Sequence, residues 1–382
     1  MKFGEEVLLV TTPAKQSHKG VQSESESGEY FEKRKLEKGV AGWVLLAGLG
    51  VAYVISGDYA GWNFGLAEGG WGGLFVATIV MAVMYLFMVF GLAELSSAIS
   101  TTGGGYAFAR RAMGPWGGFL TGTAILIEYA IAPAAIANFI GAYVDSLVGL
   151  DGWYVYLFFY AIFVGLHLYG VGEALKLMFA ITAVAVLALV VFVIAAIPQF
   201  DASNLTNIPV DTSAAGASAF LPFGLIGIWA ALPYAIWFFL AVEGVPLAAE
   251  ESKDPAKDMP RGIIAAMLAL ILFAGLILVV APGAAGSNVL QDSGNPLVEA
   301  LEAPEAYGSQ NLVSGFVNVV GLLGLIASFF SIIYAYSRQT YALSRAGYLP
   351  EAAVGHGLAK DANVGPHRPR DHRFRDGGLQ PG

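Results

Sequence analysis

The chain of 382 residues contains no cysteine. Disulfide frameworks, thiolate metal sites and cysteine nucleophiles are therefore excluded together. Charged residues are also scarce, at 13% of the chain, whereas ordinary soluble domains hold about 25%. Because 56% of the residues are apolar, the chain has too little polar material to cover a soluble fold. The composition argues against a soluble enzyme.

The charge balance argues against a nucleic-acid surface. The net charge is -9, and nucleic-acid binding requires clustered positive charge. Gly103-Gly104-Gly105 lacks the Lys and Ser/Thr that complete a phosphate loop. We expect no nucleic-acid partner, no cofactor, no catalytic residue and no metal site.

Apolar residues fall in long blocks rather than at amphipathic spacing. Each block is close to the roughly 20 residues that a helix needs to cross the hydrocarbon core of a bilayer. The sequence therefore predicts an all-α membrane protein embedded in the lipid bilayer. Eight candidate spans lie at about 40–62, 71–93, 115–144, 153–172, 176–197, 220–245, 261–283 and 311–337.

Three parts of the chain differ in composition. Residues 1–38 are polar and are expected to form a disordered cytoplasmic tail. Residues 39–350 hold the eight spans. Residues 351–382 are rich in Gly, Pro, His and Arg, and we expect a second, aberrant or disordered cytoplasmic tail.

The distribution of Lys and Arg predicts the orientation of the spans, because cytoplasmic loops retain positive charge. If the amino terminus is inside, all 20 Lys and Arg lie in cytoplasmic segments or at their membrane edges. The external loops hold acids instead, among them Asp201, Asp211 and Glu299. We therefore expect a multi-pass protein of the plasma membrane with both termini cytoplasmic.

Two spans contain helix-breaking residues. The first span is interrupted between Ile55 and Gly61, and the sixth between Glu243 and Pro246. Gly and Pro should unwind the helix there and leave bare backbone groups at membrane depth, which is tolerated only where they line a cavity. A separation of five spans is expected for corresponding helices of two inverted five-helix repeats.

Three segments after the second, sixth and eighth spans carry a family resemblance. They read Ala93-Glu94-Leu95-Ser96-Ser97 followed by Gly103-Gly104-Gly105-Tyr106-Ala107-Phe108-Ala109-Arg110-Arg111, then Ala248-Ala249-Glu250-Glu251-Ser252-Lys253-Asp254-Pro255, then Ser337-Arg338-Gln339-Thr340-Tyr341-Ala342-Leu343-Ser344-Arg345-Ala346-Gly347-Tyr348-Leu349-Pro350. Together they resemble the amino acid, polyamine and organocation (APC) superfamily of permeases. Ser56 to Trp62, Ile127 to Pro133 and Trp237 to Gly244 are most similar to ethanolamine permeases.

The resemblance covers about Gly39 to Pro350. It implies a LeuT-like inverted-repeat transporter fold, with helices 1 and 6 broken, and transport rather than enzymatic activity. Two departures stand out. Family members usually have twelve spans, so we expect an incomplete fold from a truncated or frame-shifted reading frame. Proton-coupled relatives carry a second lysine in the fifth span, where nine residues after Lys176 this chain has Ala185.

Ionisable residues within spans are costly and usually functional. Asp58 lies in the first break, where amino-acid carriers of this family offer free N–H groups to a carboxylate. An aspartate there would repel a carboxylate and attract an ammonium. The alternative is that Asp58 only caps the second half of the first span.

Glu243 lies in the sixth-span break and Glu128 in the middle of the third span. Three acids exceed what one monovalent cation needs, so we expect at least one to carry a proton or to pair with a donor. Glu128 has an open alternative as a protonated interhelical hydrogen-bond partner. His167 is expected to serve packing.

Further residues are assigned to the same site by the resemblance and the breaks. They are Ser56, Gly57, Tyr59, Tyr129, Trp237, Phe239, Ala241 and Gly244. The aromatic ones could cover an ammonium by cation–π contact, although most aromatics of this chain must face lipid or core. Ser328 and Ser331 could form a sodium site with carbonyls of the first span. Arg110 and Arg111 with Glu250 and Glu251 could form an inner gate, or be solvated charges.

The sequence predicts a secondary-transport permease for a small organic amine, with ethanolamine as the leading substrate and H+ or Na+ as the coupling ion. One alternative is an amino-acid permease, in which Asp58 points away from the substrate. Another is a non-transporting membrane protein.

Overall fold

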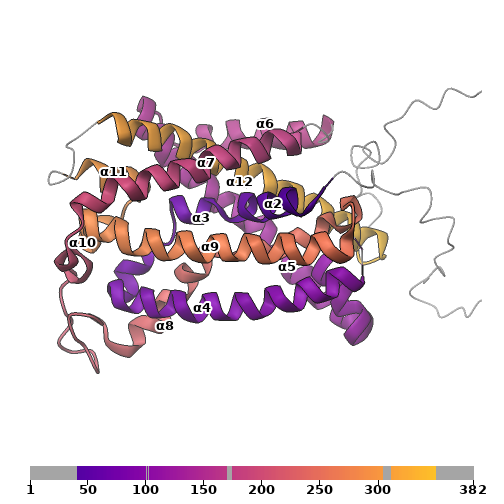
Figure 1. The fold of residues 1–382 in the computed structure, drawn as a ribbon, viewed down its shortest axis with the longest axis horizontal. Helices are drawn as coiled ribbons and strands as arrows, with labels where there is room; N and C mark the ends of the chain where they lie inside the picture. The colour runs from indigo at the N-terminus through magenta and orange to yellow at the C-terminus, as the bar shows by residue number, and fades with distance from the viewer. Residues whose placement is uncertain (1–40, 100, 102, 170–173, 304–310, 350–382) are drawn as a thin grey trace, which may run out of the picture. The chain divides into compact units, whose positions relative to one another are not determined.

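The computed structural model describes residues 41–349 except 100, 102, 170–173 and 304–310. The predicted tails lie outside these residues. Within the described part the chain is helical, and an isolated parallel bridge between Ala41 and Ser252 is its only extended pairing. The elements are α2 (Trp43–Val54), α3 (Ser56–Tyr59), α4 (Phe64–Ala98), α5 (Gly104–Val148), α6 (Trp153–Tyr169), α7 (Ala174–Ala196), η1 (Ile197–Gln199), η2 (Ala202–Thr206), α8 (Gly224–Ala235), η3 (Ile236–Phe238), η4 (Val242–Glu251), α9 (Pro255–Ala285), α10 (Ser287–Leu290), α11 (Pro296–Glu302) and α12 (Leu312–Arg345) (Figure 1).

Every predicted apolar block contains a helix in the part that the structure describes. Six helical stretches there are long and apolar enough to cross a membrane: Phe64–Ala98, Gly104–Val148, Phe179–Gln199, Gly224–Glu251, Pro255–Ala285 and Leu312–Arg345. The first and fourth predicted spans form the shorter apolar helices Trp43–Val54 and Trp153–His167. The first is short because the chain leaves the α2 helix within the predicted break.

Glycines mark the bends of the long helices. Gly70 (φ 65°) bends α4 at the predicted start of the second span, and Gly114 (φ 76°) bends α5 immediately before Pro115. Both lie in the left-handed region, which favours glycine. Helix α4 continues to Ala98 and α12 to Arg345. The segments with the family resemblance after the second and eighth spans are therefore mostly helical, and neither has an interior proline.

The first span lies in the middle of the described helices. Helix α2 packs against α9, α7 and α12, and α3 packs against α12 and η3 (Figure 1). Tyr53, Ile55 and Tyr59 are completely buried as a result. Large apolar side chains of other helices face outward instead, such as Phe87 and Trp153, each 72% exposed. In a bilayer such side chains contact lipid, so burial inside the bundle distinguishes the first span from its neighbours.

Candidate functional site

The first break is packed directly against the sixth span. Ser56–Tyr59 form one helical turn, Ala60 is extended, and Gly61 has φ 98°. A Cβ atom at Gly57 would lie 2.1 Å from the carbonyl oxygen of Trp237. Real Cβ atoms do not approach backbone that closely, so only glycine allows α3 to reach η3.

The second break begins earlier than the sequence suggested. Helix α8 ends at Ala235, η3 follows, and Ala241 has φ 79°, the only positive φ of a non-glycine residue in the described part. Such a conformation costs about 1 to 3 kcal/mol and tends to persist at functional sites. The predicted break at Glu243 to Pro246 is wrong in position. These residues belong to η4, a 3-10 helix that is wound more tightly than an α-helix and that contains Pro246 without being interrupted.

Asp58 is buried in the first break. It is 1% exposed, and neither carboxylate oxygen has a hydrogen-bond partner among the described residues. The capping alternative finds no support in the described part, because the N-cap position of α4 is Asn63 and no side chain caps that helix end. Both carboxyl oxygens of Asp58 are therefore buried without a donor from the described residues.

Glu128 and Glu243 lie close enough to interact with each other. Both carboxyl oxygens of Glu243 and one of Glu128 are buried without a well-formed hydrogen bond to the described residues. A Cβ atom at Gly244 would lie 3.1 Å from the Tyr129 hydroxyl, so the third span touches the sixth here. Asp58 interacts electrostatically with Tyr59, the next residue in the chain. The structure pairs two of the three expected acids, which suits Glu128 as an interhelical partner.

Tyr59 connects the first break to neighbouring helices. Its hydroxyl donates to the Ala185 carbonyl at 2.8 Å, and its own carbonyl accepts from Tyr143 at 3.2 Å. Its ring lies against Gly321 and Gly324, where a Cβ atom would meet it. Ala185, the position of the missing lysine, is completely buried against this assembly. The structure therefore leaves no room for a lysine there and gives the Tyr59 ring a packing role.

Ser328 contacts the first break from α12. Its hydroxyl lies 2.8 Å from the Tyr53 carbonyl and 2.9 Å from the Ser56 hydroxyl. Ser331, one turn further on, is completely buried, and its hydroxyl has no partner among the described residues. Ser328 thus brings its hydroxyl to two oxygen atoms of the first span, whereas no hydrogen bond in the described part joins Ser331 to them. Groups of three or more His, Cys, Asp or Glu able to hold a metal ion are absent from the described residues.

Glu251 has a partner that the sequence analysis missed. Its Oε1 atom lies 2.9 Å from the Arg338 guanidinium and accepts a hydrogen bond from the Tyr334 hydroxyl at 2.9 Å. The ion pair is mostly buried, because the Arg338 side chain is 14% exposed and the Glu251 side chain 16%. The Arg338 guanidinium also lies over the Tyr334 ring at 4.7 Å. A signal was present, because Arg338 directly follows an apolar span. Arg110, an expected partner, donates to the Tyr106 hydroxyl at 2.9 Å, and Arg111 is exposed.

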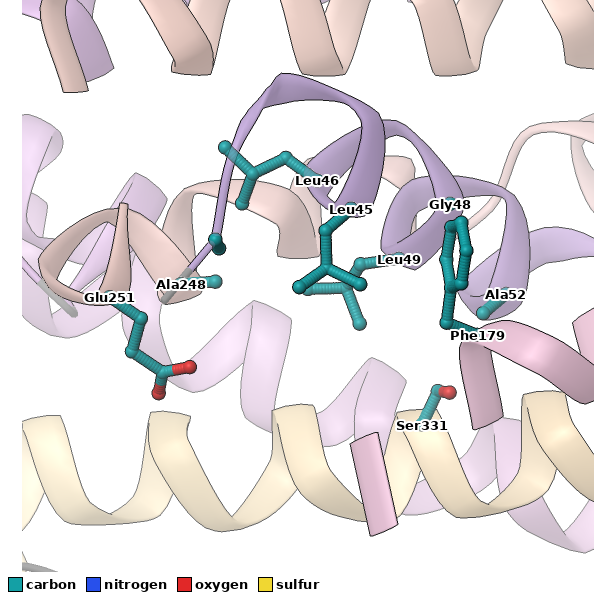
Figure 2. A pocket seen from close by; sticks show the side chains of 10 residues that line it. Leu45, Leu46, Gly48, Leu49, Ala52, Phe179, Ala248, Glu251 and Ser331 are labelled. Atoms are coloured by element: carbon teal, nitrogen blue, oxygen red, sulfur yellow. The ribbon is translucent and has the colours of Figure 1, made fainter. Parts of the chain in front are cut away.

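A small cavity lies behind the Glu251 ion pair. It is lined by α2, Phe179 and Ala248, and Figure 2 shows the Glu251 carboxylate and the Ser331 hydroxyl at its lower edge. Its volume of about 40 Å³ holds a few water molecules but no amino acid. Backbone bonds from Ala41 to Glu251 and from Lys253 to Ala41 close one end. Ser331 and Glu251 thus line the same cavity.

Asn63 is a second residue that sequence reasoning missed. It is completely buried, accepts from the Gly61 N–H at 3.1 Å, and donates to the carbonyls of Leu290 and Ser293 at 2.7 and 2.9 Å. It therefore fixes the first break to the segment between α10 and α11. Burial raises the pKa of Glu299 on α11 above its ordinary value. No local pattern marks Asn63, because its partners lie 227 and 230 positions away.

His167 packs as expected. It is 6% exposed, its ring lies 4.2 Å from the Phe330 ring, and its Nδ1 atom lies 2.7 Å from the Phe163 carbonyl oxygen.

The broken first and sixth spans pack against each other in a bundle of apolar helices. The sequence pattern of the family described as "Amino acid permease" matches residues 44–362. The chain is 31% identical over 308 residues to an uncharacterized transporter of Rhizobium meliloti, covering 79% of this chain and 64% of the relative. It is 27% identical to the methylthioribose transporter of Bacillus subtilis, with 78% and 64% covered. It is 24% identical to the branched-chain amino acid permease BcaP of Bacillus subtilis, with 73% and 61% covered.

The chain belongs to the amino acid permease family. It is an integral multi-pass membrane protein with the LeuT-like fold of that family, and the family's activity is transport rather than catalysis. The chain spans 61% to 64% of the length of these three relatives.

Proposed function

We propose that this protein is a permease for a small organic amine, with ethanolamine as the leading candidate, and that it works by alternating access around the two breaks. The carboxylate of Asp58, buried without a partner in the described part, carries the proposal. Burying a charge is unfavourable unless it is paired, and an ammonium supplies both the opposite charge and the donors. A substrate carboxylate would be repelled.

The alternative is an amino-acid permease. The names of two relatives favour it, the branched-chain amino acid permease of Bacillus subtilis and a probable GABA permease of Pseudomonas aeruginosa. In that case the break offers backbone N–H groups to the substrate carboxylate, and Asp58 takes no part.

Binding to the purified 382-residue chain separates these possibilities. We expect ethanolamine to bind at least about tenfold more tightly than alanine or serine in calorimetry, a difference of about 1.4 kcal/mol, because both amino acids carry a carboxylate that Asp58 would repel. Tighter binding of alanine would establish the amino-acid alternative. If neither binds and neither is taken up by proteoliposomes, the non-transporting alternative holds.

We propose H+ or Na+ as the coupling ion and, for sodium, a site formed by Ser328 and Ser331 with carbonyls of the first span. The Ser328 hydroxyl already lies within hydrogen-bonding distance of the Tyr53 carbonyl oxygen and of the Ser56 hydroxyl. A sodium site predicts that ethanolamine binds more tightly in sodium than in potassium buffer at constant pH. Equal affinity in the two buffers would exclude sodium.

We further propose that both termini face the cytoplasm of a plasma-membrane protein and that Glu251 contributes to an inner gate, with Arg338 as its partner. The absence of cysteine allows single-cysteine labelling without background. We expect Ala202→Cys to react with an impermeant maleimide in intact cells, and Ala248→Cys to react only in inside-out vesicles.

The gate is tested by adding Arg338→Ala to the Ala248→Cys variant. Labelling of Cys at position 248 should then be at least about tenfold faster, because Glu251 loses its ion-pair partner. Labelling of both cysteines from the same side would refute the orientation, and an unchanged rate would refute the gate.

A further inference from the structure

Two tryptophans at the breaks have buried indole N–H groups without a partner. The Nε1 atoms of Trp62 and Trp237 make no hydrogen bond to the described residues, and Trp62 is completely buried. A buried indole N–H usually finds an acceptor, as that of Trp71 does at the Leu278 carbonyl, 2.8 Å away. The unpartnered N–H groups of Trp62 and Trp237 therefore need an explanation, whereas the N–H group of Trp71 has its acceptor.

Both indoles adjoin the segment that carries Asp58. Trp62 follows Gly61 directly and stacks on Phe238 at 5.7 Å. A Cβ atom at Gly61 would lie 2.6 Å from Nε1 of Trp237, and one at Gly57 would meet the carbonyl of the same tryptophan. Asp58 lies between these two points of contact. The segment from Gly57 to Gly61 thus carries the unpartnered carboxylate of Asp58 and adjoins the unpartnered indole N–H groups of Trp62 and Trp237.

We propose that the indole N–H groups of Trp62 and Trp237 recognise an oxygen atom of the transported amine, while Asp58 binds its ammonium group. This inference rests on the proposed function and narrows its substrate class to amines that carry a nearby hydroxyl or ether oxygen. The carboxylate and the indoles are complementary in hydrogen bonding, so a ligand that satisfies both must donate at one end and accept at the other. A simple alkylamine leaves the indole donors unpaired, which a site built for hydrogen bonding penalises.

The experiment compares ethanolamine with propylamine, in which a methyl group replaces the hydroxyl. In calorimetry with the full chain we expect ethanolamine to bind at least about tenfold more tightly, since a buried donor left unpaired is costly. Trp62→Phe and Trp237→Phe should each reduce this preference at least about fivefold, while the affinity for propylamine stays within about twofold. Trp229→Phe is the matched control, because Trp229 is 73% exposed, and it should leave the preference unchanged.

Failure of this inference is distinguishable from failure of the proposed function. If neither amine binds, the proposed function is wrong and this inference with it. If both amines bind equally, or if neither phenylalanine variant alters the preference, only the role of the indoles is overturned. If the phenylalanine variants do not fold, fluorine NMR of the wild-type chain labelled with 5-fluorotryptophan tests the role of the indoles. Two of its seven tryptophan resonances should then shift with ethanolamine and not with propylamine, and the absence of that difference overturns the inference.

Discussion

Replacing Asp58 with Asn is expected to weaken ethanolamine binding by about 2 to 5 kcal/mol, the loss measured when one partner of a buried charge pair is truncated. The carboxylate is 1% exposed, so water cannot replace the lost partner. Asparagine keeps the shape of the side chain, and the effect therefore reports charge. Without amine, the variant should melt no lower than wild type, because an unpaired buried carboxylate is itself unfavourable.

Glu243→Gln and His167→Gln complete the comparison. Glu243 lies beside the second break with both carboxyl oxygens lacking a well-formed bond in the described part, so its substitution should also weaken amine binding. His167 packs on Phe330 away from both breaks, and its loss should act through packing and be smaller. Calorimetry in detergent measures all three variants. If both carboxylate variants fold and bind ethanolamine as wild type does, the acids are structural and the amine proposal loses its support.

Gly57→Ala is expected to destabilise the bundle by about 1 to 3 kcal/mol or more, the usual cost of overpacking. The new Cβ atom would lie 2.1 Å from the carbonyl oxygen and 2.9 Å from the carbonyl carbon of Trp237. Backbone cannot rotate away as a flexible side chain can, so α3 and η3 must separate. Since these segments form both breaks, binding should fall together with the melting temperature.

Gly91→Ala provides the matched control for this steric argument. Gly91 lies in α4, and a Cβ atom there would meet nothing within 4 Å. Alanine is favoured over glycine inside a helix by about 1 kcal/mol, so this variant should be neutral or slightly stabilised. Thermal unfolding of both variants in the same detergent is the measurement. Equal melting temperatures for the two would show that the first and sixth spans do not approach each other as closely as described.

The candidate site was predictable only in part. Asp58, Glu128 and Glu243 are recognisable in the sequence because an ionisable residue within an apolar block is costly and therefore rare. The family resemblance assigned the three acids to one site, but the interaction between Glu128 and Glu243 depends on how the third and sixth spans pack and was not predicted. Asn63 and Trp62 escaped notice because nothing near them in the chain distinguishes an asparagine that ties two segments together, or a tryptophan with an unpaired donor, from ordinary core residues.

The sequence by itself determined the helical membrane class, the positions of the apolar blocks and the presence of a break in the first span, because these depend on local composition and on residues that cannot continue a helix. It placed the second break a few residues late, because the left-handed Ala241 is imposed by packing and not by a glycine at that position. Only the tertiary structure decided the partner of Glu251, 87 positions away at Arg338, and the anchoring of Asn63. Hydrogen bonds and ion pairs between distant segments depend on side chains brought within about 3 Å by the packing of whole helices, and local sequence carries no record of that distance.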